Sequence, residues 1–319
     1  MHRVSVLFCV LLMAVFTKPV AASCGAAFCA LNTGAEVHGE WAQPGTRADL
    51  RFEFIRLDQL RSGSAKVGPS GEGGTHDEVS TLNRNLVLTL DHSLNERWGV
   101  SFQLPYLGRS HDHLFNDPAD GPTPESWRMQ GWGDARVVAR FQPATETSAI
   151  VSGIKFGFKL PSGSDQLKNA DGERAERTLQ PGSGTTDLIL GAYARGHIDS
   201  SVASSEWFAA ATAQRALQAH EDFRPGGQIA LDAGVSHSLT SALSAQLQLN
   251  ALLRGRDSGL QAEPGHSGSR SLYLSPGLSA MISRQATVYG YLQLPLYQHM
   301  NGTQLTSKWA AVVGYSQSF

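Results

Sequence analysis

The sequence predicts an all-β protein, a transmembrane antiparallel up-and-down β-barrel of about 12 strands with short periplasmic turns and long extracellular loops. Three observations predict this fold. Apolar and polar residues alternate along many segments, short and long connections alternate between these segments, and the last segment closes on an aromatic residue. A strand that alternates in this way has one face for lipid and one for a polar interior.

The first 22 residues have the features of a secretory signal peptide. Arg3 supplies a positive start, residues 4–16 form an apolar run, and residues 20–22 offer the small side chains that a signal peptidase requires. The run is shorter than the roughly 20 apolar residues of a spanning helix. We therefore expect export and, after cleavage, insertion into the outer membrane of a Gram-negative cell. A lipoprotein acylated at Cys24 is the weaker alternative, because Ala21 stands where a Leu-like residue is usual.

Residues 23–45 are interpreted as a periplasmic N-terminal segment. Cys9 leaves with the signal peptide, so Cys24 and Cys29 remain as a pair in an oxidising compartment, where a disulfide is the expected state. A metal site or a redox pair is the alternative, but the spacing is not that of a CxxC motif. No partner His stands at ligand spacing.

Residues 46–319 carry the barrel pattern, which is clearest at 243–253. There Leu243, Leu247 and Leu249 share one face and Gln246 and Gln248 the other. A helix cannot use this pattern, because its apolar stripe repeats every three to four residues. Similar alternation predicts strands around 47–54, 85–91, 98–106, 134–142, 150–160, 187–198, 206–217, 226–239, 269–283, 286–299 and 305–319.

The connections support a barrel more specifically than the strands do. Short links are expected near 95–96, 144–148, 199–205, 239–240 and 283–285, and long ones at 58–75, 110–130, 162–184, 218–224, 256–267 and 299–304. Outer-membrane barrels have short periplasmic turns and long outer loops, and an even number of strands. A soluble sandwich has no reason to alternate its loop lengths.

Aromatic residues near the strand ends fit the membrane interface. Tyr315 and Phe319 lie on the apolar face of the last strand and resemble the terminal signal read by the barrel-assembly machinery, although Gln317 departs from it. Outer-membrane lipid and that machinery are therefore expected partners. The expected girdle comprises Trp41, Trp98, Tyr106, Trp127, Trp132, Trp207, Tyr297, Trp309 and Phe319, with ordinary packing left open for Trp127 and Trp132.

The opposite parity places charges of both signs in the lumen. They either pair with one another and stabilise the barrel, or line a water-filled path. A barrel of 12 strands permits a narrow channel or a plugged lumen. The predicted lumen-lining residues are Asp49, Arg51, Glu53, Asp134, Arg136, Arg140, Lys155, Lys159, Asp187, Arg195, Asp232, Tyr289 and Tyr291.

Three strands run into a proline, at Pro105, Pro161 and Pro295, where ladder pairing is expected to loosen or bulge. The segments 155–163 (KFGFKLPSG), 180–184 (QPGSG) and 186–191 (TDLILG) resemble the outer-membrane transporter family associated with the meta-pathway of phenol degradation, which is distantly similar to long-chain fatty-acid and aromatic-hydrocarbon channels. The resemblance covers the middle of the chain well and the ends only by pattern.

The resemblance implies passive uptake of a small hydrophobic or aromatic solute, with Tyr289 and Tyr291 as a greasy slide or as packing against a plug. It carries over no catalytic residue, cofactor or metal ligand, so an enzyme is not expected. The net charge of −2 gives no basic face for nucleic acid.

Two other functions stay open. One is an outer-membrane hydrolase that uses luminal or rim His and Ser residues. Candidates for hydrolysis or metal binding are Ser110, His111, Asp112, His113 and His299, although a His-x-His pair on a loop is more often simply solvated. The other is a plugged structural barrel, or one that binds partners through its long loops.

Overall fold

The computed structural model describes residues 31–33, 45–71, 76–143, 150–169, 172, 174–198 and 205–319. Cys24, Cys29 and Trp41 lie outside them, so the disulfide stays a prediction. The elements are β1 (Gly45–Gly63), β2 (Ala65–Lys66), β3 (His76–Ser93), β4 (Trp98–Asp117), β5 (Gly121–Trp132), β6 (Arg136–Phe141), β7 (Ile150–Lys159), β8 (Asp187–Ile198), β9 (Ser205–Ala216), β10 (Gln228–Ser238), β11 (Leu243–Arg254), the 3-10 helix η1 (Pro264–His266), β12 (Ser269–Met281) and β13 (Ala286–Ser318).

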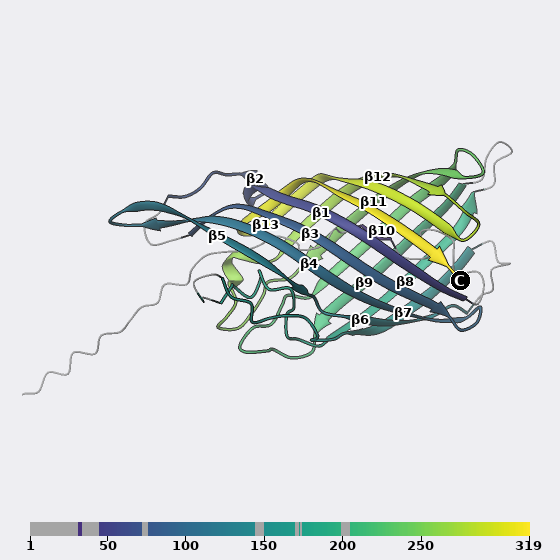
Figure 1. Ribbon diagram of the computed structural model, residues 1–319, viewed down its shortest axis with the longest axis horizontal. Helices are drawn as coiled ribbons and strands as arrows, with labels where there is room; N and C mark the ends of the chain where they lie inside the picture. Colours follow the sequence, from purple (N-terminus) through teal and green to yellow (C-terminus); the bar gives the residue numbers. More distant parts are fainter. Residues whose placement is uncertain are drawn as a thin grey trace, which may run out of the picture.

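The strands form one antiparallel sheet that closes on itself (Figure 1). Neighbours follow chain order from β1 through β3, β4 and β6 to β13, and β13 pairs back with β1. β2 pairs with β1, and β5 pairs with β4, outside this ring. Closure removes the free edges, which is the condition for a sheet to enter lipid.

β13 is long because it turns back on itself. Its residues 287–300 pair with β12, whereas residues 300–318 pair with β1, both antiparallel. Gly302 has a positive φ of 68°, and the Ser318 amide donates to the Gln285 carbonyl across 2.8 Å. β13 therefore forms two adjacent spans of the barrel wall. With the ten other ring strands of the described chain, this makes the twelve spans that the sequence predicts.

The outer surface of the ring is apolar and its inner surface is polar. Leu247 and Leu249 are 44% and 45% exposed, whereas Gln246 and Gln248 beside them are 6% and 1% exposed. This is the reverse of a soluble protein and is the pattern of an outer-membrane barrel. Exposed residues of the same kind include Leu50, Phe52, Leu86, Leu90, Phe102, Val137, Phe156, Phe158, Leu190, Leu231, Leu278 and Val313. Among the described residues, no helix is both long and apolar enough to cross a membrane.

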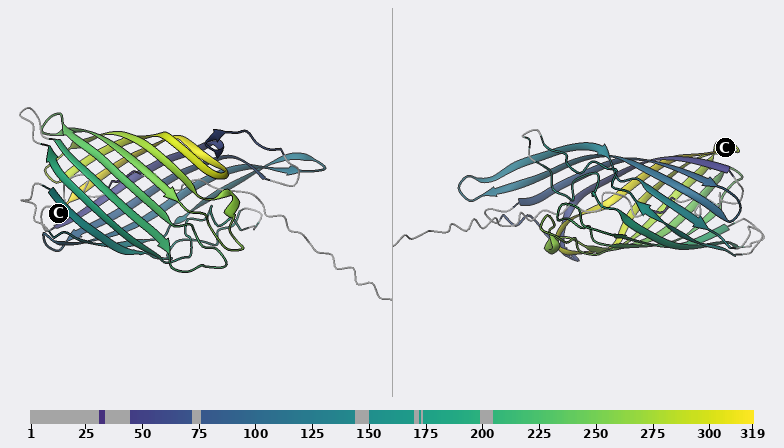
Figure 2. Two further views of the ribbon diagram at one scale, coloured as in Figure 1. Left: turned by 180° about the vertical axis from the view of Figure 1, so that it is seen from behind. Right: turned by 90° about the horizontal axis from the view of Figure 1, so that it is seen from below.

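The two ends of the barrel differ. The C-terminus lies beside the short turns at one end (Figure 1), where the Phe319 amide donates to the Thr46 carbonyl across 2.8 Å. The longer connections 160–186, 217–227 and 255–268 lie at the other end (Figure 2). In barrels of this type the short turns are periplasmic, so the long connections mark the extracellular end.

The prediction of a long loop at 110–130 is wrong. β4 continues to Asp117, and β5 begins at Gly121 directly opposite it, so the segment is a β-hairpin that projects beyond the extracellular end (Figures 1 and 2). Outside the membrane a strand needs no apolar face, so the alternation that reveals the other strands is missing. For the same reason β1 runs to Gly63, into the stretch expected to be a loop from residue 58.

The prolines stand where the sheet changes. β4 pairs with β6 as far as Gln103 and with β5 from Tyr106, so its neighbour changes at Pro105. β7 ends at Lys159, two residues before Pro161. The register between β12 and β13 shifts next to Pro295. Proline lacks the N–H that a ladder requires, which agrees with its position at each of these changes.

Of the predicted girdle residues that the structure describes, five are exposed. Trp98, Tyr297 and Trp309 are exposed on the barrel wall, and Trp132 is exposed at the end of β5. Trp127 instead is 7% exposed and belongs to a buried cluster with the mouth connection, so its role is packing. Phe319 is also exposed, and Tyr106 and Trp207 are half-buried.

Candidate functional site: the barrel lumen

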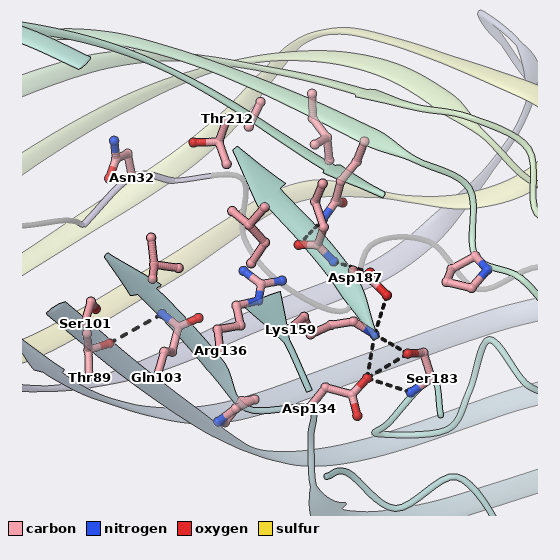
Figure 3. Close-up of a pocket in the computed structure, with 18 of the residues that line it drawn as sticks. Asn32, Thr89, Ser101, Gln103, Asp134, Arg136, Lys159, Ser183, Asp187 and Thr212 are labelled. Carbon is pink, nitrogen blue, oxygen red and sulfur yellow. Dashed lines mark hydrogen bonds and ion pairs between the residues drawn. The ribbon is translucent and has the colours of Figure 1, made fainter. Parts of the chain in front are cut away.

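A cavity of about 490 Å³ lies within the barrel (Figure 3). Inward side chains of β1, β3, β4 and β6 to β11 line it, together with the connections 160–186 and 217–227. The volume is within the usual range of about 300–1,000 Å³ for small-molecule sites.

The cavity wall is rich in positive charge. Nine basic and five acidic side chains line it, an excess of four positive charges inside a chain whose net charge is −2. The basic residues are Arg47, Arg51, Arg109, Arg136, Arg140, Lys155, Lys159, Arg177 and Arg254, and the acidic ones are Asp49, Asp91, Asp134, Asp187 and Asp232.

One group of charges is centred on Lys159, at the end of β7 (Figure 3). Its Nζ lies 2.8 Å from Asp134 Oδ2 and 3.2 Å from Asp187 Oδ1. It also donates to the hydroxyl oxygens of Ser183 and Thr185. Lys159 and Asp187 stand opposite each other in the β7–β8 register, which brings the ion pair together. Because Ser183 belongs to the connection 160–186, this group also fixes that connection to the wall.

A second group lies on β1 and β3. Arg47 donates to Asp91 Oδ2 across 3.0 Å and to Asp49 Oδ2 across 3.4 Å. Further along β1, Arg51 Nε lies 2.9 Å from Glu53 Oε1. These pairs run along the wall, so they satisfy one another without crossing the cavity between the two groups.

Arg136 on β6 is the exception to this pairing. It is half-buried, lines the cavity and points into it (Figure 3). Among the described residues it has no hydrogen-bond or ion-pair partner, and Arg51, Asp187 and Asp134 act on it only through their electrostatic fields. A guanidinium without a partner in a partly desolvated cavity is a ready binding group for a carboxylate.

The predicted luminal tyrosines pack against the N-terminal segment. Tyr289 and Tyr291 are buried with Leu31 and Val312, with their rings edge to face at 5.9 Å. The Tyr289 hydroxyl donates to the Asp49 carboxylate across 3.0 Å. Neither tyrosine lines the cavity, so of the two roles left open by the sequence, packing is the one that the geometry matches.

Residues 31–33 themselves lie inside the barrel. The Asn32 carbonyl accepts from Gln248 Nε2 across 3.1 Å, and the Thr33 hydroxyl accepts from Arg51. The described part of the N-terminal segment therefore covers the inner surface of the wall at β11 and β13 and narrows the lumen.

The other predicted lumen residues divide into two sets. Glu53 and Arg195 are buried on the inner side of the wall, but they do not line the cavity. The predicted residues that do line it are Asp49, Arg51, Asp134, Arg136, Arg140, Lys155, Lys159, Asp187 and Asp232.

Five charged lining residues were missed. Arg47, Asp91 and Arg254 stand at strand ends, and Arg109 lies in β4 between the strand predicted to end at 106 and the loop predicted from 110. Arg177 belongs to the connection 160–186. Arg47 and Asp91 are the end residues of the predicted strands 47–54 and 85–91 and have the inward parity, so parity alone could have found them, whereas no periodic signal places a loop arginine.

The connection 160–186, which we call the mouth loop, is packed over the cavity. Ala175 and Leu179 are buried against Trp127 and Met129 of β5. The Arg109 side chain donates to the Thr178 carbonyl across 2.8 Å. Burial in this loop raises the pKa of the Glu176 carboxyl to about 7.

No protein family model and no curated protein matches the chain. Among solved structures it is similar to an outer membrane channel from Pseudomonas putida F1, with a TM-score of 0.64 and 14% identity over 87% of this chain and 96% of that one. It is also similar to the NanC porin, with a TM-score of 0.47 and 10% identity over 85% of this chain and 100% of that one. The first likeness confirms the predicted fold of an outer-membrane β-barrel.

Proposed function

We propose that the protein is a passive outer-membrane channel for small solutes that are hydrophobic or aromatic in their body. The observation that carries this proposal is the cavity inside the barrel, whose wall holds an unpaired cation, Arg136. A barrel that served only as a scaffold would have no use for such a group. The fold shared with a structure named an outer membrane channel supports the same function.

The lining further favours solutes that carry a carboxylate. The excess of basic side chains attracts anions, and Arg136 can bind a carboxylate through two parallel hydrogen bonds. Leu31, Val138, Ile189 and Phe223 offer apolar surface for a ring or an alkyl chain. Small aromatic acids combine both features, so we propose them as the preferred class.

The competing account is a barrel sealed by its own ion pairs. Those pairs lie in two groups along the wall, around Lys159 and around Arg47, and the cavity lies between them. This arrangement supports a path that the charges line. The mouth loop and residues 31–33 narrow the path at its sides.

The hydrolase alternative has less support. His111 contacts Thr81 and Glu78, whereas His299 hydrogen-bonds Ser64. None of the residues invoked for hydrolysis lines the cavity.

Uptake by proteoliposomes tests the proposal. Vesicles that contain the folded protein should take up benzoate faster than empty vesicles, and Arg136→Ala should slow benzoate uptake several-fold while changing benzyl alcohol uptake little. Val137→Ala is the matched control, because Val137 is the next residue on β6 and faces lipid. Equal permeability of vesicles with and without the protein to both solutes would contradict the proposal.

A further inference from the structure

The hairpin beyond the extracellular end carries a cluster of ligating side chains from three strands. His76 opens β3, His113 lies on β4 and Glu125 on β5. One ligand atom from each of these residues lies within 4.8 Å of the others. His113 faces Glu125 directly in the β4–β5 register, and it faces Glu78 on the β3 side.

The distances suit a small cation. His113 Nε2 lies 2.6 Å from Glu125 Oε2, and His76 Nε2 lies 4.0 Å from the same oxygen. The donors of a tetrahedral ion with bonds of 2.0–2.1 Å stand about 3.4 Å apart. The two observed separations lie on both sides of this value, so the three donors stand close to the spacing that one ion requires.

Hydrogen bonds behind the cluster orient the His113 ring. Its Nδ1 lies 3.2 Å from His111 Nε2, and His111 Nδ1 lies 2.8 Å from the Thr81 hydroxyl. With a proton on each Nδ1, His113 donates to His111 and His111 donates to Thr81. A bound ion then takes the place of the proton that lies between His113 Nε2 and Glu125 Oε2, which are 2.6 Å apart. This is the arrangement by which an outer partner fixes the tautomer of a metal-bound histidine.

The His76 ring packs against the rings of Phe115 and His113, with centroids 5.0 and 4.7 Å away. Its buried Nδ1, however, has no hydrogen-bond partner among the described residues. His76 is half-buried, His113 is buried and the Glu125 side chain is 42% exposed. An ion can therefore enter from the solvent side at Glu125 and reach two imidazoles that are partly or fully buried from solvent.

We propose that His76, His113 and Glu125 form an extracellular binding site for a divalent transition-metal ion. Two imidazoles and one carboxylate suit zinc, copper and nickel, whereas calcium and magnesium require mainly oxygen ligands. The fourth position stays open to water or to an external ligand. A bound ion links β3, β4 and β5 and so stiffens the hairpin where it stands clear of the barrel.

Titration of the folded, full-length protein with Zn²⁺ in detergent tests the proposal. Calorimetry should show that one equivalent of Zn²⁺ binds tightly to each protein molecule. The variants His76→Ala, His113→Ala and Glu125→Gln should each weaken zinc binding at least tenfold. His111→Ala should weaken it about 10- to 100-fold, because it removes only the orienting partner. His237→Ala is the control and should bind zinc as tightly as the parent protein. That histidine hydrogen-bonds Ser205 at the opposite end of the barrel, away from the proposed site.

Spectroscopy with Cu²⁺ gives a second readout that does not depend on affinity. Electron paramagnetic resonance should show two nitrogen ligands in the parent protein and fewer in His113→Ala. Each variant is checked for folding by its heat-dependent gel mobility. Zinc binding that persists unchanged in all three ligand variants, or folded parent protein that binds neither zinc nor copper at micromolar concentration, would overturn the proposal.

Discussion

Single residues in the wall are positioned by strand parity and paired by register. The sequence predicts that Lys159, Asp134 and Asp187 face inward, because each stands opposite an apolar set along its strand. It does not predict that one ammonium lies between two carboxylates, since this follows from the β7–β8 register and from the chain between β5 and β6. The parity of a strand can be read from a single sequence, whereas the register depends on how two strands pair.

Removal of the ammonium should be costly. Lys159→Met leaves Asp134 and Asp187 buried without their cation, and breaking a buried pair in this way costs about 3–5 kcal/mol. Lys308→Met is the control, because Lys308 is exposed and pairs with Asp58 on the surface across 3.2 Å. Loss of such a pair costs about 1 kcal/mol or less. Urea unfolding in micelles measures both variants, and equal losses would contradict the assigned role of Lys159.

The Glu176 carboxyl makes the mouth loop sensitive to pH. Its pKa is about 7 in the closed loop, against an ordinary value of 4.5. The closed loop therefore holds the proton more tightly than an open one, so its stability is greatest below pH 4.5, falls as the pH rises to 7 and is constant above that. Hydrogen exchange at residues 174–180, corrected for the intrinsic rate, should show less protection at pH 8 than at pH 5.

The variant Glu176→Gln separates this effect from a general effect of pH. The uncharged amide cannot ionise, so loop protection in the variant should be the same at pH 5 and pH 8. A loss of protection in the variant as large as in the parent would assign the pH dependence to another group.

Among the elements, those within the membrane were predictable and those beyond it were not. β11 is formed as expected, because lipid on one side and the lumen on the other impose a strict period of two. The β4–β5 hairpin has water on its outer part, so Pro122 and Pro124 read as loop residues although they belong to a paired strand. The sequence offered His113 as a candidate metal ligand, but it did not indicate His76 or Glu125, because these join His113 only through this pairing.

Trp127 should hold the mouth loop closed. It is 7% exposed against Ala175 and Leu179, and truncating a buried aromatic residue to alanine costs about 3–5 kcal/mol. Trp127→Ala should therefore speed tryptic cleavage in the loop, at Arg174 and Arg177. Trp132→Ala is the matched control on the same strand, because Trp132 is 54% exposed on the outside. Similar cleavage rates in both variants would show that the cluster does not secure the loop.

At the scale of the whole molecule, the closed ring determines what the protein can do. Twelve spans enclose more space than side chains alone fill, and the chain uses this space for a cavity with a positive wall. The size of the ring and its polar interior were predictable from the number and alternation of the strands. The excess of positive charge was not, because part of it comes from Arg177 in the mouth loop, from Arg109 in the unpredicted part of β4 and from Arg254 at the end of β11.

The central claim, that this cavity is a permeation path controlled by its cations, is tested most directly in planar bilayers under a salt gradient. The parent protein should conduct with a reversal potential on the anion-selective side, and Arg136→Glu should move that potential toward cation selectivity while Val137→Ala leaves it unchanged. Folded protein that conducts no current, or a reversal potential that does not differ between the parent and Arg136→Glu, would contradict the account.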